Sequence, residues 1–162
     1  MNGTPPQKSK PDTFDVALIH GYCSSSSDLR NCVPSGHCLS RARVFHLRES
    51  EWIVVTDASV SVGLAAYKRA GGDVRVVHEL LFDRTLADSH ATRTTDVLLS
   101  ALEMVAHEDG VSCLTFLLRY GVVIAPFEQR GYTSLVLDHS GVWLQRKLGR
   151  PGWGEVRSDR QQ

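Results

Sequence analysis

Apolar residues along this 162-residue chain gather into short runs, and most of the runs have the length and composition of β-strands. The runs are four to nine residues long and rich in valine, isoleucine and aromatic side chains, which is typical of half-buried or buried strands. Strands are predicted at Phe14–Ile19, Val44–Leu47, Trp52–Thr56, Val62–Lys68, Val74–Phe82, Val111–Leu118, Thr133–Leu137 and Val142–Leu148.

Two turn signals arrange some of these strands as neighbours. Gly71 and Gly72 lie between the strands Val62–Lys68 and Val74–Phe82, and a glycine pair supplies the positive φ angles of a tight hairpin. The segment Asp138–Gly141 separates the last two strands in the same way. We therefore expect both pairs to be antiparallel.

The period changes to that of a helix after residue 94. Val97, Leu98, Ala101, Leu102, Val105 and Ala106 recur at helical spacing, and Gly110 ends the pattern. Thr94, Thr95 and Asp96 suit the start of this helix. A shorter helix is predicted at Val122–Gln129, and the serines before Asp28 suit the cap of another short helix. The fold class is therefore α/β (α+β), with a mixed, mostly antiparallel central sheet flanked by helices.

Length and composition indicate a single domain. A chain of 162 residues with 42% hydrophobic residues can bury one substantial core, but it is too short for two ordinary domains. Residues 1–13 are polar and rich in proline, so we expect a disordered leader there. The domain then spans residues 14–149, and residues 150–162 form a flexible tail.

The charge balance and the absence of long apolar stretches exclude several function classes. Eighteen basic and eighteen acidic side chains cancel, so nucleic acid is not an expected partner. No stretch approaches the roughly 20 apolar residues of a membrane span, and the N-terminus has no secretory signal. We expect a cytoplasmic protein without a membrane partner. The sequence leaves open whether it forms a homodimer.

Cysteine spacing gives no metal site. Cys23, Cys32 and Cys38 lie near His20 and His37, but the short Cys-x(2–4)-Cys spacing of structural zinc sites is missing. Reduced thiols and no bound metal are the expectation.

Several segments, taken in order, resemble one family. In the strand Val62–Tyr67 a glycine follows an apolar residue, and the segment His78–Phe82 lies in the next strand. Further on, Phe127–Tyr132 ends at a Gly-aromatic pair, and the last strand, Val142–Leu148, follows it. This order is similar to that of the GNAT superfamily of acyl-coenzyme A dependent N-acetyltransferases. The resemblance covers about Arg43 to Leu148 and implies a GNAT-like fold with acetyl-CoA as co-substrate.

The resemblance implies where the coenzyme binds. In relatives the backbone of the fourth strand, here at Leu81, Phe82 and Asp83, holds the thioester and pantetheine. The start of the next helix offers N–H groups to the pyrophosphate. The matching stretch Ser89–Thr95 lacks the usual glycines. In their place stand three hydroxyl donors and one cation for phosphate, namely Thr92, Thr94, Thr95 and Arg93. The alternative is that this stretch is only a polar connection.

The resemblance also suggests catalytic residues for direct attack of an amine in a ternary complex. Glu79 matches the family's base on the fourth strand, with His78 as the second candidate, because strand alternation directs only one of the two toward the substrate. Phe127 replaces the tyrosine that acts as general acid in many relatives. Tyr120 replaces an asparagine at the start of the closing helix and is a candidate acid. The acceptor is a small-molecule or peptide amine that the sequence does not specify.

Two alternatives remain open. The missing glycines and tyrosine favour a catalytically inactive protein of the same fold that binds a ligand or a partner. A hydrolase is the other alternative, since His20-Gly21 resembles an oxyanion turn and Ser59 with His139 would complete the chemistry. The hydrolase lacks support from a Gly-x-Ser-x-Gly nucleophile elbow, which this chain does not contain.

Overall fold

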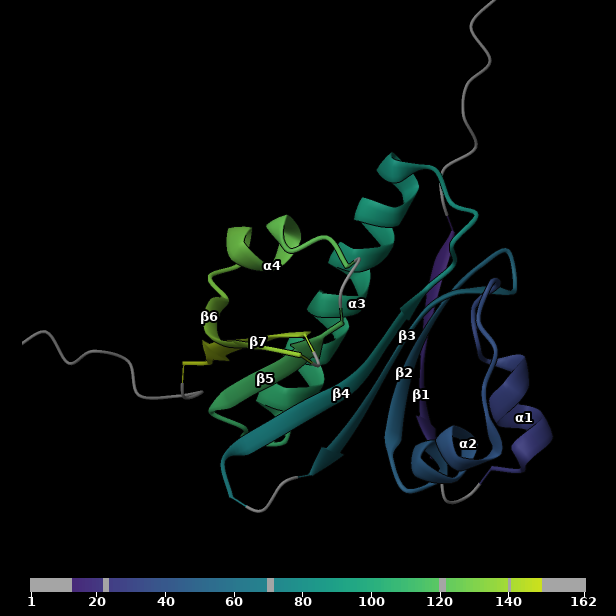
Figure 1. Cartoon of the computed structure of the whole chain (residues 1–162), viewed down its shortest axis with the longest axis horizontal. Helices are drawn as coiled ribbons and strands as arrows, with labels where there is room; N and C mark the ends of the chain where they lie inside the picture. The colour runs from purple at the N-terminus through teal and green to yellow at the C-terminus, as the bar shows by residue number, and fades with distance from the viewer. Residues whose placement is uncertain (1–12, 22–23, 70–71, 120–121, 140, 150–162) are drawn as a thin grey trace, which may run out of the picture.

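A seven-stranded mixed sheet runs through the whole domain (Figure 1). The computed structural model describes residues 13–21, 24–69, 72–119, 122–139 and 141–149. The strand order is β1-β2-β3-β4-β5-β7-β6, and only β4 and β5 pair in parallel. The predicted fold class is thus confirmed. The elements are β1 (Phe14–His20), α1 (Ser26–Asn31), α2 (Arg41–Arg48), β2 (Glu51–Asp57), β3 (Val60–Arg69), β4 (Val74–Phe82), α3 (Asp88–Glu108), β5 (Cys113–Leu118), α4 (Ala125–Gln129), β6 (Thr133–Asp138) and β7 (Gly141–Lys147).

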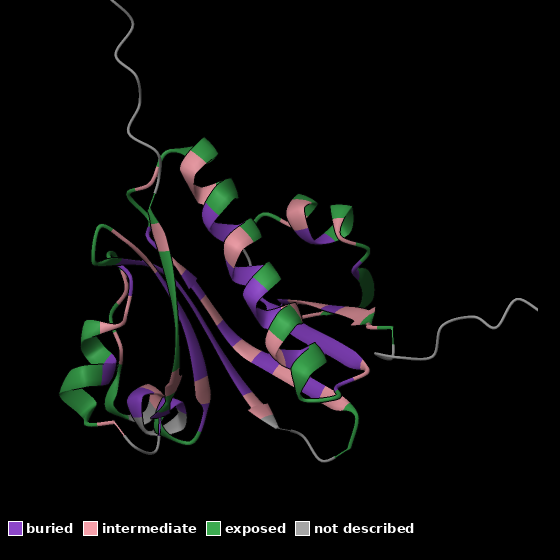
Figure 2. Ribbon diagram, turned by 180° about the vertical axis from the view of Figure 1, so that it is seen from behind, coloured by how far each residue is buried: buried purple, intermediate pink, exposed green. Residues whose placement is uncertain are grey.

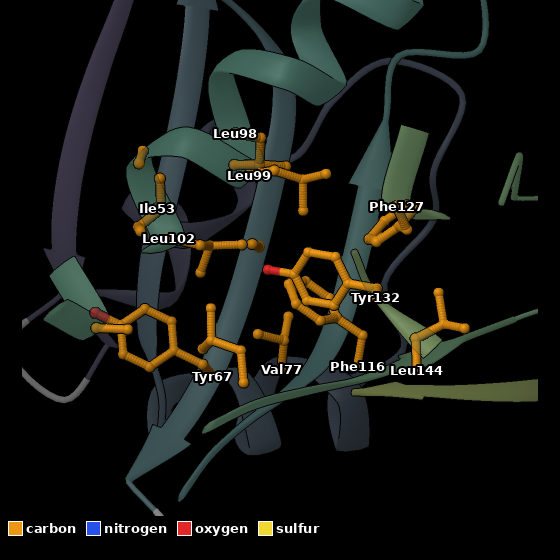
Figure 3. Packing of buried hydrophobic residues seen from close by; sticks show 14 of the residues in the cluster. Ile53, Tyr67, Val77, Leu98, Leu99, Leu102, Phe116, Phe127, Tyr132 and Leu144 are labelled. Carbon is orange, nitrogen blue, oxygen red and sulfur yellow. The ribbon is translucent and has the colours of Figure 1, made fainter. Parts of the chain in front are cut away.

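Helices cover both faces of the sheet, so the hydrophobic core consists of two clusters, one on each face. The larger cluster lies under α3 and α4, where one stripe of α3 is buried and its outer stripe is exposed (Figure 2). Leu98, Leu99 and Leu102 of α3 meet aromatic and aliphatic side chains of the strands there (Figure 3). The smaller cluster lies under α1 and α2 and contains Leu29, Leu47, Trp52, Val54, Leu64, Ala66 and Leu81. None of the described helices is long and apolar enough to cross a membrane.

Both predicted hairpins and the short capped helix are confirmed. Strands β3 and β4 are antiparallel, as are β6 and β7. Helix α1 begins after Ser25, whose hydroxyl accepts the N–H of Asp28 while the Asp28 carboxylate accepts the N–H of Ser25. This reciprocal capping box explains a helix start despite weak periodicity. The Ser25 hydroxyl, by donating to the Asp28 carboxylate, also lowers the pKa of Asp28.

The strand predicted at Val44–Leu47 is wrong, because these residues lie in helix α2. A run of only four residues has no measurable period, so its neighbours decide its structure. Val44 and Leu47, three residues apart on one helix face, are both buried. The Trp52 indole N–H donates to the Leu47 carbonyl at 2.7 Å, which ties the end of α2 to β2.

Helix α3 begins at Asp88, so the start predicted near Thr94 is wrong. Tertiary contacts hold the extra turns against the sheet. His90 lies 3.2 Å from the Asp57 carboxylate, and its ring packs at 5.2 Å, centroid to centroid, on Phe14. The hydroxyls of Thr94 and Thr95, which suit a helix cap in the sequence, donate instead to the carbonyls four residues earlier.

Gly63 lets α3 approach the sheet closely. A Cβ atom at this position would lie 2.9 Å from the Cγ2 atom of Thr94, which is fully buried. Real Cβ contacts are longer than this, so any side chain here must push α3 away from β3.

We expect Gly63→Ala to lower the free energy of unfolding by about 1–3 kcal/mol through overpacking against Thr94. Urea denaturation measures the change. Gly149→Ala is the matched control, because nothing lies within 4 Å of its added Cβ. Thr94→Ser removes the Cγ2 methyl group and keeps the hydroxyl, so Gly63→Ala should cost much less in that background. Equal stability of Gly63→Ala and the parent protein would contradict the close contact.

Candidate active site

A β-bulge in β4 places both predicted base candidates on the same face of the sheet. Ala66 of β3 pairs with Glu79, whereas the next residue, Tyr67, pairs with Val77, so His78 is the extra residue of the bulge. Side chains normally alternate between faces, and one extra residue breaks that alternation. The expectation that only one of His78 and Glu79 faces the substrate side is therefore wrong.

These two side chains line a hollow between α2 and the central strands. Its volume is about 390 Å³. Val77 points to the opposite face and belongs to the core beneath α3. The lining residues are Arg43, Leu47, Lys68, Val76, His78, Glu79 and Arg119.

Glu79 is a buried carboxylate held by an arginine. Its side chain is 5% exposed, and the Arg43 guanidinium bonds both carboxylate oxygens, with Nε donating to Oε2 at 3.0 Å. An Arg119 nitrogen lies 3.8 Å from Oε2. Burying a carboxylate is costly unless a cation and hydrogen bonds compensate it, and Arg43 provides both.

His78 is positioned by a second buried group. Its Nε2 atom lies 2.8 Å from the hydroxyl oxygen of Ser50, which is 2% exposed. Ser50 lies two residues after the end of α2, and its N–H donates to the Leu47 carbonyl. The end of α2 thus fixes the imidazole beside the Glu79 carboxylate.

Strands β4 and β5 run side by side at one end and then separate (Figure 1). They pair only over Val74–Val77 and Cys113–Phe116, although β4 continues to Phe82. In the described part of the chain, no strand pairs with the second half of β4 on that side. The backbone of β4 is therefore available there to bind an extended ligand.

The ladder with β3 shows which backbone groups face the opening. The Asp83 N–H donates to the Val62 carbonyl at 2.9 Å, and neighbours of such a pair turn their N–H and C=O groups the other way. Of the predicted backbone contacts, Phe82 faces the opening, whereas Leu81 and Asp83 face β3. Leu80, which the sequence analysis did not select, faces the opening too. The Phe82 carbonyl lies 2.7 Å from the Nε2 atom of His37.

The predicted phosphate contacts lie inside α3. The hydroxyls of Thr92, Thr94 and Thr95 donate to helix carbonyls at 2.9, 2.9 and 2.8 Å, and Thr94 and Thr95 are buried. Arg93 is exposed on the same helix. Because residues within a helix use their N–H groups internally, the N–H groups open to a phosphate belong to the first turn, at Asp88 and Ser89.

No general acid is found among the described residues at the closing helix. Phe127 is fully buried, with its ring centroid 5.4 Å from that of Phe116. The Tyr132 hydroxyl donates to a Glu103 oxygen at 3.0 Å, and burial raises the pKa of Tyr132. Tyr120, the predicted acid, lies outside the described residues.

The hydrolase alternative fails on backbone geometry. Ala58 and Ser59 have positive φ angles of 47° and 69° and form the two-residue turn between the antiparallel strands β2 and β3. A nucleophile elbow instead joins a strand to a helix. Ser59 is therefore a hairpin residue. No group of three or more metal-ligating side chains occurs in the described part of the chain, and Cys23 lies outside it.

Comparison with solved structures gives a consistent likeness of fold. No protein-family model and no curated protein matches the chain. The ribosomal-protein-S18-alanine N-acetyltransferase from Escherichia coli aligns with a TM-score of 0.64 at 13% identity, covering 87% of this chain and 97% of that one. PaiA N-acetyltransferase from Thermoplasma acidophilum, solved in complex with coenzyme A, gives 0.58 at 10% identity, covering 83% and 99%. The GNAT domain of S. lividans PAT gives 0.58 at 18% identity, covering 82% and 89%.

The ion pair between Arg43 and Glu79 should govern stability on this side of the sheet. We expect Arg43→Met to cost about 2–4 kcal/mol in urea denaturation, because among the described residues the buried carboxylate then keeps only the longer contact to Arg119. Glu79→Gln should cost less, and the double variant should recover most of the loss, since no buried charge remains.

Arg48→Met serves as the control for this cycle. Arg48 ends the same helix and is exposed, so its loss should change the free energy of unfolding by less than about 0.5 kcal/mol. Additive effects of Arg43→Met and Glu79→Gln would show that the two side chains do not depend on each other.

Proposed function

Since this chain has the GNAT fold, we propose that it transfers an acetyl group from acetyl-CoA to an amine by direct attack in a ternary complex. The observation that carries the proposal is the position of Glu79 and His78. Because of the bulge, both candidate bases point into the same hollow, beside the point where β4 separates from β5. Bulges are common next to active sites because they re-aim side chains in this way.

The reaction needs one proton acceptor and a held thioester. The neutral amine nitrogen attacks the thioester carbonyl, so a C–N bond forms, the C–S bond breaks and coenzyme A leaves as a thiolate. The amine proton passes to Glu79, directly or through a water molecule, and the thiolate takes a proton from solvent. A carboxylate has about four acceptor positions, so Glu79 can accept a hydrogen bond from the amine or from a bridging water while Arg43 stays bound.

The donor would bind along the open edge of β4. The N–H and C=O groups of Leu80 and the N–H group of Phe82 are suited to an amide-rich chain such as pantetheine, much as a sheet edge accepts an added strand. The Phe82 carbonyl already contacts the His37 ring. The diphosphate would then meet the first turn of α3 at Asp88 and Ser89. The predicted contacts of Thr92, Arg93, Thr94 and Thr95 would contribute little, because they lie within the helix.

Loss of the family's tyrosine is compatible with this chemistry. A thiol has a pKa of about 8.5, so a thiolate is a moderately good leaving group without an acid beside it. Phe127 serves the core instead, where it packs on Phe116 and Tyr132 (Figure 3).

A non-catalytic binding protein is the second candidate function. Two observations favour it: Phe127 cannot donate a proton, and the glycine-free stretch before Asp96 is helical instead of forming a loop. Such a protein would keep the β4 edge as a ligand site without turnover.

Binding of the donor is tested by thermal melting. Excess acetyl-CoA should raise the melting temperature by several degrees, since a ligand at about 100 times its Kd adds about 2.7 kcal/mol to the folded state. S-acetylpantetheine, which lacks the diphosphate and adenosine, should give most of the same shift. No shift with either compound at millimolar concentration would exclude the donor site on β4.

Catalysis is tested by substituting each of the two candidate bases in turn. Glu79→Gln should leave the acetyl-CoA melting shift unchanged and lower turnover about a hundredfold, the usual contribution of a general base. His78→Ala should have the smaller effect, because Ser50 already occupies its Nε2 atom. The assay is release of free thiol with a panel of amines. Turnover that is equal in Glu79→Gln and the parent protein would remove Glu79 from the mechanism, and absence of turnover with retained binding would establish the second candidate function.

A further inference from the structure

The charges around the hollow point to a particular class of acceptor. Resting on the proposed function, we infer that the acceptor is a small amine that also carries a carboxylate close to its reactive nitrogen, as an amino acid does. Arg119 binds this carboxylate while the nitrogen faces Glu79.

The hollow has more positive than negative charge. Three cationic side chains, Arg43, Lys68 and Arg119, line it together with one carboxylate, that of Glu79. Arg43 already bonds both oxygens of Glu79 and so neutralises it. Lys68 and Arg119 are not used by this carboxylate in the same way.

Arg119 is the cation best placed to bind one. It follows the last residue of β5, and its side chain is 60% exposed. In the described part of the chain, its ion-pair partner is Glu79, at 3.8 Å. Most of its five N–H donors are therefore open to the hollow and to solvent, and a guanidinium matches a carboxylate with two parallel hydrogen bonds.

Lys68 contributes positive electrostatic potential to the hollow more than a direct contact with the acceptor. Its ammonium lies 3.4 Å from a Glu49 oxygen, with both side chains about half exposed. Pairs of this kind are weak and screened, so Glu49 cancels the charge of Lys68 only in part.

This field selects against simple cations. An alkyl amine has a pKa near 10 and arrives as an ammonium ion, which Arg119 and Lys68 repel. The same cations favour the neutral amine over the ammonium ion, which is the form that attacks. A carboxylate on the acceptor offsets the repulsion by pairing with Arg119. Polyamines and lysine-rich peptides should therefore be poor acceptors.

The size and walls of the hollow fit a small molecule. A volume of about 390 Å³ is near the lower end of the range for small-ligand pockets, about 300–1,000 Å³. Leu47 and Val76 supply apolar wall beside the charged groups. An amino acid has both parts, a charged end and a side chain that can pack on such a wall.

Two measurements test the inference on the full-length protein. In the first, thiol release from acetyl-CoA is measured with amino acids, with the matching amino acid amides and with spermidine. Amino acids should react best, and Arg119→Gln should raise their KM about tenfold to a hundredfold while the KM of the amides stays unchanged. Arg119→Lys should restore part of the loss. Arg30→Gln is the control, because it removes an equal charge from the exposed surface of α1.

The second measurement does not depend on turnover. Titration calorimetry of N-acetyl amino acids, the products of the inferred reaction, should show binding that Arg119→Gln weakens and that the N-acetyl amino acid amides lack. Transfer to amides or spermidine as fast as to amino acids would overturn the inference and leave the acetyltransferase function standing. Arg119-dependent binding without any transfer would support the carboxylate site and overturn the acetyltransferase function. Absence of Arg119-dependent binding would overturn the carboxylate site itself.

Discussion

One buried charge organises the side of the molecule that faces α2. The carboxylate of Glu79 lies in an otherwise apolar part of β4, and such a group is tolerated only with a cation bonded to it. Arg43 fills that need and thereby fixes the orientation of α2, whose end in turn positions Ser50 and the His78 ring. The ion pair thus has a structural role, and in the proposed function a chemical one as well. Removing either partner disturbs both.

The strands, hairpins and fold class could be predicted from the sequence because they depend on local chemistry. β-branched runs and turn-forming glycines act over a few residues, so β3, β4 and their hairpin were correct. The errors arose where distant contacts decide. Val44–Leu47 is helical because α2 packs over Trp52, and α3 begins early because His90 is held by Asp57 and Phe14. The bulge at His78 leaves no signal in the residue pattern. Arg43, Lys68 and Arg119 were missed for a related reason, since their role appears only when β3, β5 and α2 converge.

The donor side departs from the loop that the sequence resemblance implied. Threonines that looked like phosphate ligands satisfy their hydroxyls within α3, and Gly63 lets this part of the helix lie directly on β3. Close packing of α3 and an open, glycine-lined phosphate loop exclude each other at the same position. In the proposed function, recognition of the donor therefore falls mainly on the backbone of β4, which does not depend on side-chain identity.

The bulge at His78 changes which residues of β4 face α3. Before it, odd-numbered residues such as Val77 point toward α3, and after it the even-numbered Leu80 and Phe82 do. The positions of β4 that require apolar side chains therefore change from odd to even numbers within a single strand. A related sequence that lacks one residue here would direct its acidic side chain into the hydrophobic core beneath α3. Whether a homologue keeps its carboxylate on the face of the hollow can then be judged by counting residues between the hairpin glycines and the carboxylate, before any comparison of residue types.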